Sequence, residues 1–134
     1  MTTSQTPTFE HEIAIVPRDI DDMGHVNNAV YLRWVQEAIV DYWQHISSTD
    51  AQEALLWVAL KHEIVYREPL FLNDEVDALV TATGTRGSRA SFLTNFRRGE
   101  DIVSEVRSSW CCVDTVTRRP QRIAHDIARR FLPS

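Results

Sequence analysis

The sequence contains no run of about 18 apolar residues, the length that a membrane-spanning helix needs. Its first residues, MTTSQTPTFEHE, are polar and lack the apolar core of a secretory signal peptide. A Gly-x-Ser-x-Gly nucleophile elbow and a Gly-rich phosphate-binding loop are also absent from the sequence. These absences predict a cytoplasmic protein that does not span a membrane and is not a serine hydrolase of the α/β type.

Cysteine is scarce, because the chain has only Cys111 and Cys112, which are adjacent. On a strand their side chains would point to opposite faces of the sheet, so a disulfide between them would be badly strained. A redox or metal centre would need further Cys or His residues at ligand spacing. We therefore expect both thiols to fill the core or an interface, and we expect no cofactor.

Positive charge is in deficit, since 14 Lys and Arg residues stand against 19 Asp and Glu residues, for a net charge of −5. This balance argues against nucleic acid as a partner. It is compatible with an anionic small ligand, because a local pair of arginines can hold a phosphate. With 134 residues, 43% of them hydrophobic, the chain is expected to form one domain over 9–134 after a flexible tail at 1–8.

Hydrophobic periodicity predicts an α+β protein with one sheet and one central helix. The helix is expected over 28–44, where most residues are apolar and the polar ones form a single stripe. A strand at 9–16 precedes it, and a loop at 47–54 follows. Four antiparallel strands then extend to Asp114, separated by a connector at 68–74 and turns at 85–89 and 98–101, before a short helix at 124–131. The open edges of such a sheet predict self-association, as a homodimer or homotetramer.

Residues 18–37, RDIDDMGHVNNAVYLRWVQE, carry most of the functional signal. Asp19 and Asp21 precede a Gly-His turn, and Asn27 and Asn28 then open the long helix. A helix N-terminus presents unpaired backbone N–H groups and a partial positive charge. A carboxylate just upstream can face a substrate whose developing negative charge those N–H groups stabilise, which suits acyl transfer or hydrolysis. The acidic residues lack the spacing of a calcium loop and the paired His of a zinc site, so no metal is expected.

The same stretch resembles the motif of the hot-dog thioesterases, in their 4-hydroxybenzoyl-CoA thioesterase-like branch. There an Asp-x-Asp-x-x-Gly segment precedes the central helix, and many members continue His-Val-Asn-Asn-x-x-Tyr, as this chain does from Asp19 to Tyr31. The resemblance implies a hot-dog fold, in which a curved antiparallel five-stranded sheet wraps around a long central helix. It also implies an enzyme that hydrolyses an acyl-CoA thioester to the free acid and CoA.

By this resemblance Asp21 is the catalytic carboxylate, acting as nucleophile or as general base for water. The alternative is an aspartate that serves only the turn or caps the helix. In the same branch the backbone N–H seven residues later polarises the thioester carbonyl, and that residue here is Asn28. His25 would orient the carboxylate or contact the thioester, with a turn histidine as the alternative. Met23 stands where the related plant acyl-ACP thioesterases have a catalytic Asn, so their full triad does not transfer.

Substrate contacts are predicted for six further residues, which are Asn27, Tyr31, Trp34, Arg86, Ser88 and Arg89. Asn27 and Asn28 can also cap the helix. The two aromatic residues would line the acyl pocket or else belong to the core. The two arginines and the serine lie in a turn that would hold the CoA phosphates or else be solvated. By the resemblance, the segment Lys61–Glu63 would reach the site from the opposite subunit.

Two other functions are compatible with the sequence. An acyl-ACP thioesterase would use Arg86 and Arg89 against the acidic helix of a carrier protein. A regulatory module would bind acyl-CoA without releasing thiol, and the carboxylate of Asp21 favours the enzyme over such a module. A hot-dog hydratase is disfavoured because its Asp-x-x-x-x-His spacing is absent, since Asp21 and His25 are four residues apart.

Overall fold

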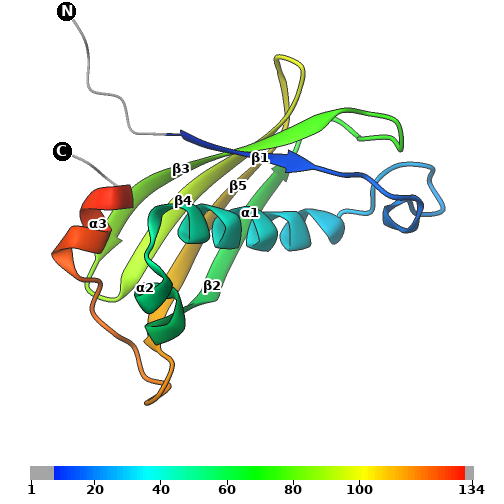
Figure 1. The fold of residues 1–134 in the computed structure, drawn as a ribbon. Helices are drawn as coiled ribbons and strands as arrows, with labels where there is room; N and C mark the ends of the chain where they lie inside the picture. The colour runs from blue at the N-terminus through cyan, green and yellow to red at the C-terminus, as the bar shows by residue number, and fades with distance from the viewer. Residues whose placement is uncertain (1–7, 132–134) are drawn as a thin grey trace, which may run out of the picture.

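The computed structural model describes residues 8–131, which form one five-stranded antiparallel sheet, a long helix and three shorter helical segments (Figure 1). In chain order the elements are β1 (Thr8–Ile13), the 3-10 helix η1 (Pro17–Asp19), α1 (Val30–Ile46), α2 (Thr49–Ala54), β2 (Leu55–Tyr66), β3 (Val76–Arg86), β4 (Arg89–Arg98), β5 (Asp101–Asp114) and α3 (His125–Phe131). Residues 1–7 of the predicted tail lie outside the described part, and Thr8 already belongs to β1.

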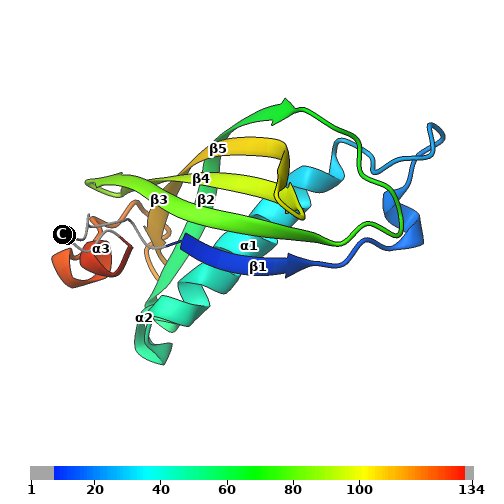
Figure 2. The same ribbon diagram turned by 90° about the horizontal axis from the view of Figure 1, so that it is seen from above.

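The long helix α1 lies along the concave face of the curved sheet, which is the predicted hot-dog arrangement (Figure 1, Figure 2). Its buried residues recur at spacings of three and four and are Tyr31, Trp34, Val35, Ala38, Ile39, Tyr42 and Trp43. They form one hydrophobic core with inward-facing strand residues such as Val80, Phe92 and Phe96. Of the large apolar residues of α1, Leu32 and Val40 are exposed, at 38% and 45%. The single chain therefore buries most of the large apolar side chains of this helix.

The strand order is β1-β3-β4-β5-β2, so β2 and β1 are the two edges of the sheet. The turns of the β3–β4 and β4–β5 hairpins contain Gly87 and Gly99, whose φ angles of 62° and 63° suit glycine. β2 pairs with β5 and not with β3, so the residues between β2 and β3 cross an end of the sheet (Figure 2). The connector expected at 68–74 is therefore a crossover between strands that are not neighbours in the sheet.

Three local boundaries also differ from the prediction. Segment 49–54 is the helix α2 and not a loop, because the Ser48 hydroxyl accepts the Ala51 N–H at 3.1 Å and so caps a turn of helix. The first strand ends at Ile13, before the 3-10 turn that starts at Pro17. Helix α1 starts at Val30, two residues later than expected.

The two cysteines are both buried and free, as expected from their spacing. Burial raises the pKa of the Cys112 thiol to about 11, and the neighbouring Cys111 adds to this effect. A thiol with this pKa is protonated at neutral pH, so Cys112 behaves as a packing residue. Within residues 8–131, no helix has both the length and the apolar character that crossing a membrane requires.

Candidate active site

The segment between η1 and α1 is held in place by Asp19, whose side chain is 1% exposed. Asp19 Oδ2 accepts the Val16 N–H at 3.0 Å, and Oδ1 accepts a hydrogen bond from Arg33 Nη2 on α1 at 3.0 Å. The Asp19 carbonyl accepts the Asn27 N–H at 2.8 Å. Asp19 therefore connects the start of the motif, the end of the motif and the long helix. Its role is structural.

Asp21 lies in a small antiparallel loop that is closed by a bridge between Ile20 and Val26. Its N–H donates to the carbonyl of His25 at 3.0 Å, and its Oδ1 accepts the Met23 N–H at 2.9 Å. The second carboxylate oxygen has no hydrogen-bond partner in the described part of the chain. His25 Nδ1 lies 3.9 Å from Asp21 Oδ1. The carboxylate thus serves the turn through one oxygen and leaves the other available.

The N–H groups at the start of α1 show a distinctive pattern. Asn27 Oδ1 accepts the Ala29 N–H at 2.9 Å, and the Asn27 carbonyl accepts the Val30 N–H at 2.9 Å. The carbonyl of Asn28 accepts the Tyr31 N–H at 3.4 Å. The N–H of Asn28 itself has no acceptor within residues 8–131. The N-cap position of α1 is Ala29, which has no side-chain cap. Asn27 instead accepts the Ala29 N–H just before the helix, and Asn28 provides a free donor there.

A cavity of about 200 Å³ lies beside Asn28 and is lined by His25, Val26, Asn28, Tyr31, Tyr66, Arg67, Glu68 and Pro69. Asp21 is not part of the lining, and its carboxylate lies 3.9 Å from the ring of His25, which does line the cavity. Burial raises the pKa of Tyr31 to about 12, with Tyr66 the next cause, so the Tyr31 hydroxyl is protonated at neutral pH. Trp34 is 1% exposed and packs against Tyr31 and Phe96 in the core, outside the cavity lining.

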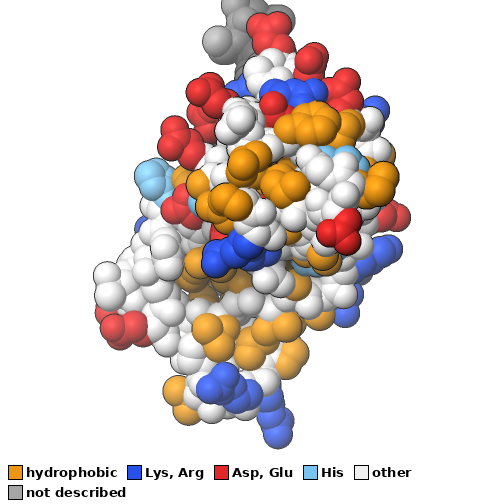
Figure 3. All heavy atoms as spheres, turned by 90° about the vertical axis from the view of Figure 1, so that its right-hand side faces the viewer, with side chains coloured by type: hydrophobic (Ala, Val, Ile, Leu, Met, Phe, Trp, Pro, Cys, Tyr) orange, Lys and Arg blue, Asp and Glu red, His pale blue; other side chains and the backbone are white. Residues whose placement is uncertain are grey.

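The connector after β2 is fixed to the rest of the fold and gives the cavity a stable wall. Leu70 is fully buried, and its carbonyl accepts the Val26 N–H at 2.8 Å. Arg98 at the end of β4 pairs with Glu68 at 3.1 Å and with Asp74 at 3.0 Å. Figure 3 looks onto this end of the molecule, where exposed hydrophobic side chains lie among acidic ones.

The predicted phosphate-binding turn lies elsewhere in the single chain. Arg86, Ser88 and Arg89 form the β3–β4 turn, at the opposite end of the sheet from the start of α1 (Figure 1). The Ser88 carbonyl accepts the Cys112 N–H at 2.7 Å, which anchors this turn to β5. One chain therefore places His25, Asn28 and Tyr31 in the lining of one cavity, with Asp21 3.9 Å from His25. The three turn residues are not part of that lining.

The segment Lys61–Glu63 lies in the middle of the edge strand β2. Both ring nitrogens of His62 are buried without a hydrogen-bond partner in the described residues, and burial lowers the pKa of this imidazole. The His62 ring packs edge-on against Trp110, with ring centroids 5.7 Å apart.

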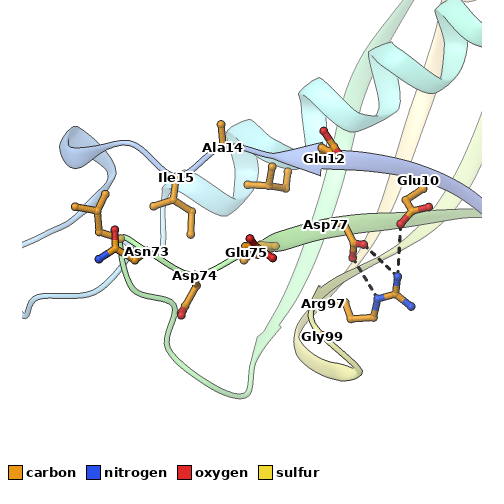
Figure 4. Close-up of a pocket in the computed structure, with 13 residues that line it drawn as sticks. Glu10, Glu12, Ala14, Ile15, Asn73, Asp74, Glu75, Asp77, Arg97 and Gly99 are labelled. Atoms are coloured by element: carbon orange, nitrogen blue, oxygen red, sulfur yellow. Dashed lines mark hydrogen bonds and ion pairs between the residues drawn. The ribbon is translucent and has the colours of Figure 1, made fainter.

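A larger hollow of about 910 Å³ lies between β1 and the start of β3 (Figure 4). Its wall carries the carboxylates of Glu10, Glu12, Asp74, Glu75 and Asp77. Arg97, the one arginine in this lining, is already paired with Asp77 at 3.1 Å and with Glu10 at 3.6 Å. Because the uncompensated charge is negative, this hollow is a poor site for an anionic ligand. Across residues 8–131, no group of three or more His, Cys, Asp or Glu side chains is arranged to hold a metal ion.

A sequence profile of the thioesterase-like superfamily matches residues 15–131 of the chain. The chain belongs to this superfamily. The prediction of a thioester hydrolase with a hot-dog fold is confirmed at the level of the family. No curated protein sequence matches the chain.

Solved structures resemble this member of the thioesterase-like superfamily over almost its whole length. A thioesterase from Thermus thermophilus, complexed with coenzyme A and Zn, is 25% identical, with a TM-score of 0.79 over 91% of this chain and 90% of that one. A 1,4-dihydroxy-2-naphthoyl-CoA thioesterase from Synechocystis is 15% identical, with a TM-score of 0.79 over 95% and 97% of the two chains. A Staphylococcus aureus protein in complex with CoA is 15% identical, with a TM-score of 0.81 over 97% and 85%.

Part of the cavity of this superfamily member could not be found from the motif. Tyr66 and Pro69 line it from the end of β2 and from the connector, far along the chain from Asp21. Strand periodicity gives Tyr66 an inward direction, because it alternates with Val65. Which residues it meets depends on the order of the strands, which local patterns do not encode.

Proposed function

We propose that this protein hydrolyses an acyl-CoA thioester to the free acid and CoA. The observation that carries the proposal is the N–H of Asn28, which has no acceptor within residues 8–131. Asn28 lines a cavity together with His25, and His25 lies 3.9 Å from the Asp21 carboxylate. A donor fixed at a helix start and left without an internal acceptor is suited to a carbonyl oxygen that gains negative charge. A thioester carbonyl under attack has such an oxygen.

In the proposed reaction the carboxylate of Asp21 acts in one of two ways. As general base it takes a proton from water, whose oxygen then bonds to the thioester carbon. As nucleophile its free oxygen bonds to that carbon, and water later hydrolyses the resulting anhydride. In both routes the carbonyl oxygen becomes an oxyanion at the Asn28 N–H. The C–S bond then breaks, and the CoA thiolate leaves and takes up a proton.

The position of His25 is compatible with two roles in the proposed reaction. Its ring lies 3.9 Å from Asp21 Oδ1, so it can orient the carboxylate when its Nδ1 carries a proton. It also lines the cavity, where it can supply a proton near the leaving sulfur. Tyr31, whose ring forms part of the cavity wall, would contact the acyl group, and Asn27 would hold the helix start in register.

A two-fold pair of chains would complete the proposed site. The outward side chains of β2 include Leu56, Val58 and Leu60, which are exposed, and β2 is an open edge. A second copy paired along this edge by two-fold symmetry would run antiparallel to the first. Its β3–β4 turn, with Arg86 and Arg89, would then lie at the same end of the joined sheet as Asp21. Its β4 strand would be three strand spacings from β2, or about 15 Å.

The experiment that tests the proposal measures thiol release from aryl-, short-, medium- and long-chain acyl-CoAs by the wild type and by Asp21→Asn. Asn keeps the size of Asp and can still accept the Met23 N–H, but it can neither attack a thioester nor take a proton from water. We expect a loss of at least about 10³ in kcat with a modest change in KM. The matched control is Asp22→Asn, an exposed neighbour in the same loop, which should retain turnover.

Two results would overturn the proposal. Turnover by Asp21→Asn at a rate close to that of the wild type would remove the assigned carboxylate. Stoichiometric binding of acyl-CoA by the wild type without thiol release would show a binding module in place of an enzyme.

A further inference from the structure

Tyr66, the last residue of β2, joins the edge strand to the start of α1. Its hydroxyl donates a hydrogen bond to the carbonyl oxygen of Asn28 at 3.0 Å, although the two residues are 38 positions apart. It also lines the cavity that Asn28 and His25 line. The bond is therefore a tertiary contact made at the edge of the proposed site.

This hydrogen bond fixes the C=O of a peptide unit whose N–H is also hydrogen-bonded. The unit that links Asn28 to Ala29 has its C=O on the Tyr66 hydroxyl and its N–H on Asn27 Oδ1, at 3.0 Å and 2.9 Å. The only other donor to the Asn28 carbonyl in the described chain is the Tyr31 N–H, at the longer distance of 3.4 Å. Both groups lie before the first regular turn of α1, which begins at Val30. The helix alone therefore does not fix this unit.

The preceding peptide unit carries the free N–H of Asn28. Its C=O, from Asn27, accepts the Val30 N–H at 2.9 Å. The direction of the Asn28 N–H depends on the backbone angles of Asn28, which relate these two peptide units to each other. Clamping the second unit with Tyr66 restricts those angles, and so it also restricts the direction of the free N–H.

The ring and the hydroxyl of Tyr66 are themselves well placed for this task. The ring packs edge-on against Tyr31, with centroids 5.2 Å apart and an interplanar angle of 81°. Burial raises the pKa of the Tyr66 hydroxyl, so this group keeps its proton and remains a donor at neutral pH. The residue is 43% exposed, so the contact lies at the mouth of the cavity and not in the core.

We propose that Tyr66 is a positioning residue for thioester hydrolysis, which fixes the backbone at Asn28 so that its N–H meets the developing oxyanion. This role rests on the proposed function. Tyr66 acts through Asn28, because its hydroxyl proton is already donated to the Asn28 carbonyl. Its loss should weaken an interaction made mainly in the transition state, and so lower kcat more than it raises KM.

Tyr66→Phe tests the role, because it keeps the ring and its contact with Tyr31 and removes only the hydroxyl. We expect kcat to fall about tenfold, less than the roughly 10²–10³ that follows the removal of an oxyanion donor itself. KM should stay within about twofold. Tyr42→Phe is the matched control, since it removes a buried tyrosine hydroxyl that has no partner in residues 8–131, and it should leave kcat unchanged.

A second measurement does not depend on turnover. In amide hydrogen exchange followed by NMR, the Ala29 and Val30 N–H groups, which are hydrogen-bonded to Asn27, should exchange faster in Tyr66→Phe than in the wild type, while amides of β4 stay the same. An unchanged kcat, a matching rise in KM, or unchanged exchange at both amides would each overturn the role of Tyr66. Asp21→Asn is assayed in parallel, and retention of its turnover would overturn the proposed function instead.

Discussion

Asp19→Ala is expected to destabilise the protein by about 2 kcal/mol. The carboxylate is buried and accepts two hydrogen bonds, from the Val16 N–H and from Arg33. Leaving the part-buried Val16 N–H without an acceptor costs about 1–2 kcal/mol, in the lower part of the range for such groups. The Arg33 pair adds about 0–1 kcal/mol, because that side chain is 40% exposed and water can replace the carboxylate.

Asp19→Asn should cost less, about 1 kcal/mol. The amide oxygen can still accept the Val16 N–H, whereas the charge opposite Arg33 is lost. For a chain of this length, 1 kcal/mol corresponds to a shift in Tm of about 4 °C. We therefore expect Tm to fall by about 8 °C in the alanine variant and about 4 °C in the asparagine variant.

Urea and thermal denaturation followed by circular dichroism measure this loss. Protein concentration must be kept constant, because self-association would make the apparent stability depend on it. Asp22→Ala, an exposed carboxylate three residues on, should leave Tm within about 1 °C of the wild type. An Asp19→Ala protein with the Tm of this control would refute the reasoning, since it would mean that the buried carboxylate holds nothing in place.

Replacing Arg86 and Arg89 by Ala should raise KM for acyl-CoA far more than it lowers kcat, because phosphate pairs contribute uniform binding. Kinetics with an acyl-pantetheine fragment provide the comparison, and an equal effect on both substrates would mean that the arginines do not bind the nucleotide. Light scattering should give a molar mass of at least twice 15.4 kDa. Val58→Asp on the β2 edge should reduce both this molar mass and the activity. The control Val116→Asp, on the exposed stretch after β5, should change neither. Because burial lowers the pKa of His62, its neutral form stabilises the fold above about pH 6.5 and this stability is lost as the pH falls. Urea titrations at pH 7.5 and pH 5 should therefore show a smaller acid-induced loss in His62→Phe, and identical losses in both proteins would contradict this.

The motif could be predicted because its parts are close in sequence. Asp21, His25 and Asn28 fall within one loop and the helix start that follows, so spacing alone brings them near one another. The helix start itself was misplaced by two residues. Asn27 and Asn28 were both expected to cap α1, but the N-cap is Ala29 and has no side-chain cap. The Asn27 side chain instead folds back onto the Ala29 N–H.

The period-two alternation of apolar residues, which is a local property, predicted which face of each strand is buried. It did not predict the order of the strands in the sheet. That β2 pairs with β5 depends on the path of the connector, which is held by the buried Leu70 and by the contacts of Arg98. The contact of Tyr66 with Asn28 follows from this order. Local patterns therefore predicted which candidate residues the loop carries, and missed the residues of β2 and the connector that line the cavity.

The order of the strands also has a consequence for the rate of folding. The pairs β3–β4 and β4–β5 are joined by short turns. The two edge strands instead pair with residues far along the chain, as Thr8 does with Thr81 and Leu55 with Asp114. Contacts between such distant residues slow folding, because chain entropy is lost before they form. We expect the central strands to form first, and the edges to join last. Pulse-labelled hydrogen exchange during refolding should then protect amides of β4 before those of β1. Until the sheet is complete, the apolar face of α1 is open to water, and this interval is when the chain is most prone to aggregate.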